Sequence, residues 1–181
     1  MIAEPERLPA IDLMPGELHL ARDPVILQTI LGSCVSVTFW SSSLRIGAMC
    51  HGVLARLPAD EAANASHSQR SRYLDYSIRY LAQQFAQLGL AKKDLEIKVF
   101  GGADVLAMGG ATHAKPTVGV LNCLAASQVL AESELTISAS DLGGQRGRKI
   151  HFNTATGEVL VRRLAAWRDD AEDVSNRRIA K

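Results

Sequence analysis

The sequence lacks several features that would assign a class of function directly. Its 20 basic and 19 acidic side chains are scattered, with no clustered basic stretch. Because phosphate backbones select a basic face, we expect no nucleic-acid partner. No apolar run reaches the roughly 20 residues that cross a bilayer, so we expect a protein that is not membrane-embedded. Residues 1–9 lack a charged start followed by a hydrophobic run, so we expect no secretory signal.

Cysteine and cofactor-binding motifs are also scarce. The three cysteines, Cys34, Cys50 and Cys123, are an odd number without the spacing of a disulfide framework, which favours a reducing cytoplasm. No C-x-x-C or H-x-x-x-H spacing occurs, so we expect no bound metal. The glycine-rich stretch 101–119 contains no G-x-x-x-x-G-K and no G-x-G-x-x-G after a strand. We therefore expect no nucleotide cofactor.

The order of the predicted elements indicates a layered α+β fold. Helical spacing predicts helices over 74–88 and 118–130, with Leu121, Leu124 and Ala125 of the second facing inward. Because strands and helices do not alternate strictly, we expect layers of mostly antiparallel β-sheet flanked by these two main helices. Period-two alternation and turn residues predict strands at 25–30, 35–39, 44–54, 95–99, 135–139, 149–152 and 158–161. The last two of these strands are expected to form a hairpin.

The length of the chain predicts one domain with a real core. We expect this domain to span residues 1–164, and its first part, 1–17, to be irregular and proline-rich. The polar, alanine-rich stretch 56–69 predicts a surface loop. Residues 165–181 contain eight charged side chains and few apolar ones, so we expect a charged C-terminal tail.

One cysteine and one histidine form the best candidate site. Cys34 follows Gly32 and Ser33 between two predicted strands, and glycine there lets the backbone bend and expose the sulfur. His51 comes seventeen residues later on the next predicted strand, where an imidazole can hold a thiol as thiolate and shuttle its proton. The alternative is that Cys34 is a buried small hydrophobe without a catalytic role.

The remaining candidates are weaker. Cys50 precedes His51 directly, so on a strand its side chain points to the opposite face and packs. Cys123 falls on the apolar side of a predicted helix and is also expected to pack. Asp141 and Arg146 belong to a glycine-rich turn, where they are either structural or line the cleft.

Four motifs follow one another along the chain: LGSCV at 31–35, GAMCH at 47–51, FGGA at 100–103 and DLGGQRGRK at 141–149. Together, over about residues 16–164, they resemble those of the CheD family of bacterial chemotaxis. The resemblance implies a fold similar to that of the cytotoxic necrotizing factor toxins. It also implies a cysteine hydrolase that converts chemoreceptor glutamines to glutamates and releases ammonia. The partners would be cytoplasmic helices of chemoreceptors and a CheC-like phosphatase.

The resemblance also assigns the catalytic residues. It places the nucleophile on Cys34 and the histidine on His51, and it implies a threonine upstream of the cysteine. The family's threonine lies six residues before the cysteine, where this chain has Gln28, with Thr29 next to it. Because side chains alternate along a strand, this one-residue shift would aim Thr29 away from the site unless a β-bulge corrects it, and we assign Thr29. The stretch 118–122 departs from the family as well, since it lacks a charged Glu-Arg pair before the asparagine.

The implied chemistry is amide hydrolysis through a thioester. Thiolate Cys34, with an imidazolium neighbour, attacks the glutamine carbonyl, and backbone N–H groups near Ser33 stabilise the oxyanion. His51 protonates the departing ammonia and then activates water, while Thr29 orients the imidazole. Two alternatives stay open. One is a methylesterase that acts on receptor glutamyl esters through the same thioester, and the other is a non-catalytic module that binds a CheC-like phosphatase.

Overall fold

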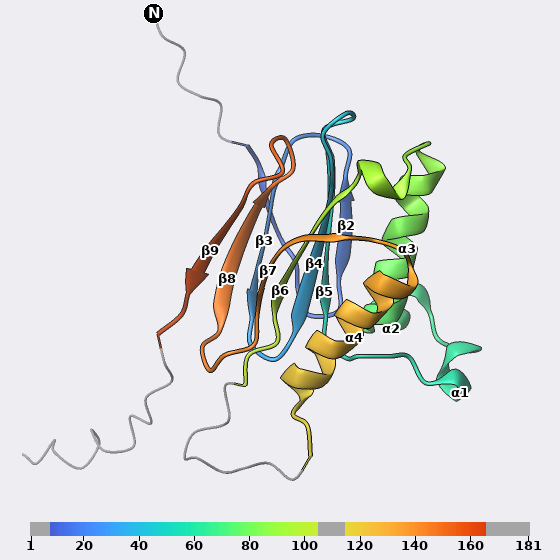
Figure 1. The fold of residues 1–181 in the computed structure, drawn as a ribbon, viewed down its shortest axis with the longest axis vertical. Coiled ribbons are helices and arrows are strands. Elements are labelled where there is room, and N and C mark those ends of the chain that lie inside the picture. The colour runs from blue at the N-terminus through green and yellow to red at the C-terminus, as the bar shows by residue number, and fades with distance from the viewer. Residues whose placement is uncertain (1–7, 105–114, 166–181) are drawn as a thin grey trace, which may run out of the picture.

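Two β-sheets stack face to face, and two helices cover the outer face of one of them (Figure 1). The structure is a computed structural model that describes residues 8–104 and 115–165. The four-stranded sheet has the order β1-β3-β8-β9 and the five-stranded sheet the order β2-β5-β4-β6-β7. Only the pairs β1–β3 and β6–β7 are parallel in this part of the chain. The predicted α+β fold with mostly antiparallel sheets is confirmed.

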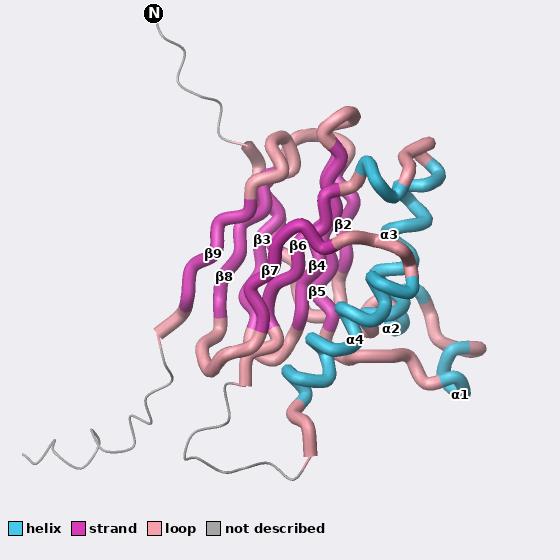
Figure 2. Tube along the Cα trace, in the orientation of Figure 1, coloured by secondary structure: helices cyan, strands magenta, loops and turns pink. Residues whose placement is uncertain are grey.

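The elements of each layer come from separate parts of the chain (Figure 2). The first sheet contains β1 (Ala10–Asp12), β3 (Ile26–Leu31), β8 (Arg148–Asn153) and β9 (Val159–Arg163). The second contains β2 (Leu18–Ala21), β4 (Val35–Ser41), β5 (Ile46–Gly52), β6 (Glu96–Gly101) and β7 (Ile137–Leu142). The helices are α1 (Ala59–Ala62), α2 (His67–Arg70), α3 (Leu74–Gln87), α4 (Val118–Glu132) and the 3-10 turn η1 (Lys92–Asp94).

Strand β5 separates two hydrophobic cores. Ala48 and Cys50 point toward α3 and α4, whereas Met49 points into the core between the two sheets. Since side chains alternate along a strand, His51 lies on the Met49 side, facing the four-stranded sheet. The period-two pattern of the sequence thus determines which layer receives the histidine.

The prediction that Leu121, Leu124 and Ala125 face inward is confirmed for Ala125 and wrong for the two leucines. These side chains are 44% and 52% exposed, and the buried face of α4 instead carries small residues such as Gly119 and Ala126. The helix is apolar on nearly all sides, so hydrophobic spacing does not select a face. Close approach to the sheet selects it, because a Cβ at Gly119 would lie 2.6 Å from the carbonyl oxygen of Gly102.

Two stretches expected to be irregular contain regular structure. Segment 56–69 is not a loop throughout, since it contains α1 and the start of α2. Helix α2 begins at a capping box, in which the side chains of Ser66 and Gln69 each bond the other residue's backbone N–H. Strand β1 lies within the stretch 1–17, where it gains hydrogen-bond partners from β3. The tail from residue 166 onward lies outside the described residues.

Candidate functional site

Cys34 lies where the chain passes from one sheet to the other. Strand β3 of the four-stranded sheet ends before it, β4 of the five-stranded sheet starts after it, and residues 32–34 make the connection. The connection is fixed by the backbone after β6. Gly102 N–H donates to the Cys34 carbonyl and Ala103 N–H to the Gly32 carbonyl, both at 2.8 Å. The half-buried Cys34 thus sits on a rigid backbone, at the strand junction expected from the sequence.

His51 lies across the sheet from this connection. It pairs with Ser36 on β4. Cys34 lies one residue before β4 and two residues from Ser36 along the chain. Cys34 also packs on the core between the sheets, which His51 faces. The structure therefore brings the two predicted residues to the same face.

Thr29 connects His51 to the four-stranded sheet. Its Oγ1 lies 2.7 Å from His51 Nδ1 and also donates to the Leu13 carbonyl at 2.7 Å. A carbonyl can only accept, so the hydroxyl hydrogen is committed to Leu13 and the hydroxyl oxygen accepts from His51 Nδ1–H. This arrangement selects the imidazole tautomer whose Nε2 is unprotonated. Nε2 is buried and has no hydrogen-bond partner among the described residues.

The structure brings Thr29 and not Gln28 to the histidine. Thr29 is 4% exposed and faces the core between the sheets. Gln28 is half-buried on the opposite face of β3, in register with Asp12 on β1 and His151 on β8. The register of β3 with β8 runs without interruption, so no bulge is needed for Thr29 to face His51.

The electrostatics favour a neutral pair. Burial raises the pKa of the Cys34 thiol, an effect that its own backbone N–H partly opposes. Burial lowers the pKa of His51, against the opposing influence of the Leu13 carbonyl and the Glu17 carboxylate. These directions indicate a thiol and a neutral imidazole at rest, where the sequence led us to expect a thiolate and an imidazolium.

The other two cysteines pack, as predicted. Cys50 is fully buried on the helix side of β5, and burial raises its pKa to about 11. Cys123 is half-buried on α4, where its Sγ lies 3.8 Å from the Gly102 carbonyl oxygen. Burial raises the pKa of Cys123 as well, as it does that of Cys34.

Asp141 has a structural role that the sequence left open. Its Oδ1 accepts from the fully buried Arg148 at 2.7 Å and from Arg163 at 2.8 Å. Arg148 also donates to the backbone carbonyls of Asp141 and Gly143. Since Gly143 N–H donates to the Gly101 carbonyl at 2.9 Å, this network holds the glycine-rich turn against the end of β6. The Arg146 side chain is exposed on the same turn.

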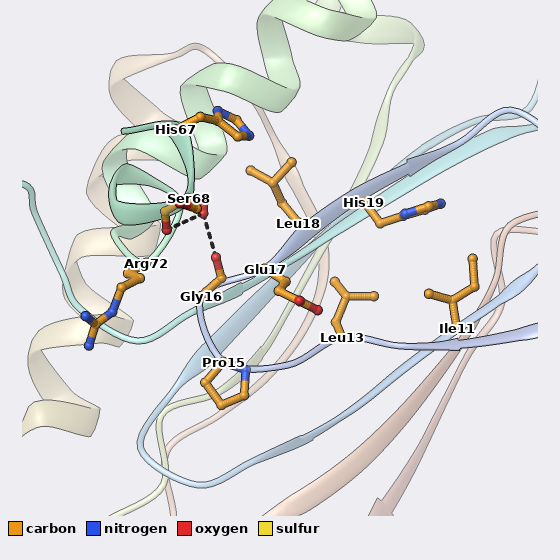
Figure 3. A pocket seen from close by; sticks show the side chains of 11 residues that line it. Ile11, Leu13, Pro15, Gly16, Glu17, Leu18, His19, His67, Ser68 and Arg72 are labelled. Atoms are coloured by element: carbon orange, nitrogen blue, oxygen red, sulfur yellow. Dashed lines mark hydrogen bonds between the residues drawn. The ribbon is translucent and has the colours of Figure 1, made fainter. Parts of the chain in front are cut away.

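A pocket lies between the β1–β2 segment and α2 (Figure 3). Its volume is about 470 Å³, and its lining includes Leu13, Glu17 and His67. Neither Cys34 nor His51 lines it. Its relation to the site is through the backbone, because the carbonyl of Leu13 accepts the Thr29 hydroxyl and the carbonyl of Glu17 accepts the His51 N–H.

Residues 8–104 and 115–165 contain neither a candidate metal site nor a candidate membrane-spanning helix. No group of three or more His, Cys, Asp or Glu side chains there is arranged to hold a metal ion. None of the helices in these ranges is long and apolar enough to span a membrane.

Sequence reasoning did not assign a role to Asn122. This buried side chain on α4 donates from Nδ2 to the Ser33 carbonyl at 3.0 Å and to the Val53 carbonyl at 2.9 Å. It thus contacts the residue before Cys34 and a residue just beyond His51. A single amide in the otherwise apolar stretch 118–126 was the available signal, since an unpaired buried amide is costly.

Comparison with known proteins gives consistent results. A family model described as CheD chemotactic sensory transduction matches residues 56–163. The probable chemoreceptor glutamine deamidase CheD 2 of Geobacter sulfurreducens is 43% identical over 91% of this chain and 96% of its own length. The probable chemoreceptor glutamine deamidase CheD of Oleidesulfovibrio alaskensis is 37% identical over 87% of this chain and 74% of its own length. The protein of the same name from Maridesulfovibrio salexigens is 34% identical over 84% of this chain and 90% of its own length.

These matches differ in how they cover the site. The family-model match begins after Thr29, Cys34 and His51. The Geobacter match covers 91% of the 181 residues and so includes those three positions. The family is shown by the extent of both matches, and the chain belongs to the CheD family.

Proposed function

We propose that this protein hydrolyses glutamine side chains of chemoreceptors to glutamate through a thioester on Cys34. One domain over residues 1–164 carries the activity. The observation that carries the proposal is the hydrogen bond from His51 Nδ1–H to Thr29, because it leaves the basic Nε2 free on the face that Cys34 shares. The names of the relatives, probable chemoreceptor glutamine deamidases, supply the substrate.

The first half-reaction forms the thioester. Cys34 Sγ attacks the side-chain carbonyl carbon as its proton passes to His51 Nε2, which suits a thiol and imidazole that are neutral at rest. The imidazolium then gives that proton to the departing nitrogen, and ammonia leaves as the carbon–nitrogen bond breaks. Thr29 keeps the ring aligned in both steps, and its hydroxyl oxygen accepts from Nδ1–H when the ring is charged.

The second half-reaction opens the thioester with water. His51 Nε2 removes a proton from the water, and the resulting hydroxide adds to the carbonyl carbon. The carbon–sulfur bond breaks, the sulfur regains its proton from the imidazolium, and glutamate is released. Oxyanions form in both halves. The backbone N–H groups of Ser33 and Cys34, which have no carbonyl acceptor among the described residues, are the donors we assign to them.

The proposed partner surface is the exposed apolar face of α4. Val118, Leu121 and Leu124 are 50%, 44% and 52% exposed, and their spacing of three residues puts them on one side of the helix. Helix α4 begins at the same end of the sheets as the β3–β4 connection (Figure 1). A cytoplasmic receptor helix lying on this face would present its glutamine to Cys34 and cover the apolar side chains. Such a substrate places the protein in the cytoplasm.

A receptor cytoplasmic fragment tests the surface. Leu121→Glu places a charge on the face of α4 and should raise the KM for the fragment about ten-fold or more, because a buried unpaired charge is costly. Leu160→Glu is the matched control, since Leu160 is an equally large, 61% exposed leucine on β9 of the other sheet. Equal KM values for the two variants would contradict the assignment of the α4 face.

The same fragment separates the candidate reactions. Released ammonia and a gain of about one dalton per glutamine, from replacing NH₂ by OH, support deamidation. Conversion of a methyl-esterified fragment alone would replace the deamidase with a methylesterase. Binding of the fragment or of a CheC-like phosphatase, with no conversion of either substrate, would replace it with a binding module.

A further inference from the structure

Asn122 is a buried polar side chain that bonds two backbone segments at once. It is 1% exposed on α4, and the two hydrogens of its Nδ2 go to the carbonyls of Ser33 and Val53. These partners fix the orientation of the amide. If the amide were flipped, its oxygen would face the two carbonyl oxygens and could not accept a hydrogen bond from either. The Oδ1 atom on the other side is buried and finds no partner among the described residues.

The contact with Ser33 has a consequence for Cys34 through the peptide bond. The Ser33 carbonyl and the Cys34 N–H belong to one planar trans peptide and point in opposite directions. Whatever holds the carbonyl therefore also aims the N–H. The carbonyls on either side, of Gly32 and Cys34, are held by backbone N–H groups, so the Ser33 carbonyl is the one in this connection whose partner is a side chain.

The second contact links the same amide to the strand of the histidine. Val53 follows the end of β5, two residues after His51. One side chain thus spans the backbone beside the nucleophile and the backbone beside the base. The buried Oδ1 without a partner offsets part of the stability that the two hydrogen bonds to the carbonyls contribute.

We propose that Asn122 is a positioning residue that aims the Cys34 N–H at the oxyanion by holding the Ser33 carbonyl. This inference rests on the proposed amide hydrolysis. It requires no contact between Asn122 and the substrate. Loss of the amide frees the Ser33–Cys34 peptide to rotate, so the oxyanion loses a fixed donor while Cys34 and His51 keep their side chains.

The test compares a reaction that forms an oxyanion with one that does not. Asn122→Ala should lower kcat for the receptor fragment about ten-fold or more with little change in KM, since a single oxyanion donor contributes up to about 10²–10³ in rate. Alkylation of Cys34 by iodoacetamide displaces iodide from a saturated carbon and forms no oxyanion. Its rate and pH profile should stay within about two-fold of wild type.

Ala126→Gly is the matched control for weakened helix packing. Ala126 is fully buried one turn later on α4, and glycine there lowers helix stability without touching the Ser33 carbonyl. This variant should have a lower Tm than wild type and an unchanged kcat. If Asn122→Ala does not fold, Asn122→Ser, which is shorter and keeps only one donor, is measured in its place with the same expected division between kcat and alkylation.

Three results would overturn the proposal. A kcat within about two-fold of wild type would show that the Ser33 carbonyl needs no side-chain partner. A parallel loss of kcat and of Cys34 alkylation would show that Asn122 merely supports the fold. Failure of wild-type protein to convert the fragment would instead overturn the proposed function, and with it the inference that rests on it.

Discussion

Thr29 Oγ1 and His51 Nδ1 lie 2.7 Å apart, and this hydrogen bond joins β3 of the four-stranded sheet to β5 of the five-stranded sheet. The candidate catalytic residues therefore straddle the interface between two layers. The packing of the sheets, with Met49 and Leu27 buried between them, sets the distance between threonine and histidine. Mutations in that core should consequently affect turnover as well as stability.

Removing the hydroxyl of Thr29 tests its role directly. Thr29→Val keeps size and β-branching, but it leaves both His51 Nδ1–H and the Leu13 carbonyl without this partner. We expect turnover to fall about ten-fold or more and the free energy of unfolding to fall by roughly 1–3 kcal/mol. Gln28→Ala, on the other face of β3, should leave turnover unchanged. The reverse outcome for the two variants would assign the third position to Gln28.

His51 should control the reactivity of Cys34 at neutral pH. In His51→Ala the thiol loses the Nε2 acceptor for its proton, and burial still holds its pKa above the ordinary value. We expect alkylation by iodoacetamide to be slower at neutral pH and to need a more alkaline solution. Mass spectrometry measures the alkylation of each cysteine separately, so Cys50 serves as an internal control. A profile identical to wild type would mean that the two residues are not coupled.

The buried histidine should also make stability depend on pH. The ordinary pKa of 6.5 applies to the unfolded chain, and burial lowers that of His51 in the folded protein. Below about pH 6.5 the unfolded state therefore binds a proton that the folded state does not, and the free energy of unfolding decreases as the pH falls. Urea unfolding from pH 7.5 to 5 measures this decrease. It should be smaller in His51→Gln, and equal slopes would show that His51 does not titrate in this way.

Strands β3 to β9 and the shared face of Cys34 and His51 could be predicted because their signals are local, whereas β1 and β2 were not predicted. The alternation in 35–39 and the spacing of small residues around Cys34 and His51 are visible in the sequence. The choice between Gln28 and Thr29 could not be derived from a local pattern, because it depends on the register of β3 against β8, which is a contact between distant segments. The same holds for Leu13, whose backbone carbonyl bonds Thr29 and leaves no trace in residue type.

The face of α4 could not be predicted for a different reason. Its side chains are apolar on nearly all sides, so the sequence gives no preferred direction. The sheet accepts the side with Gly119 and Asn122, since that side permits close approach and two hydrogen bonds to carbonyls. Leu121 and Leu124 are left outside, where a pattern based on hydrophobicity alone would have buried them.

The central claim is that Cys34 forms the bond to the substrate, and one measurement tests it most directly. A receptor cytoplasmic fragment is incubated with wild-type protein, Cys34→Ala and the matched control Cys50→Ala, and each glutamine is followed by mass spectrometry. We predict a gain of about one dalton at selected glutamines with wild type and with Cys50→Ala, and none with Cys34→Ala although that variant folds normally. Undiminished conversion by Cys34→Ala would contradict the account.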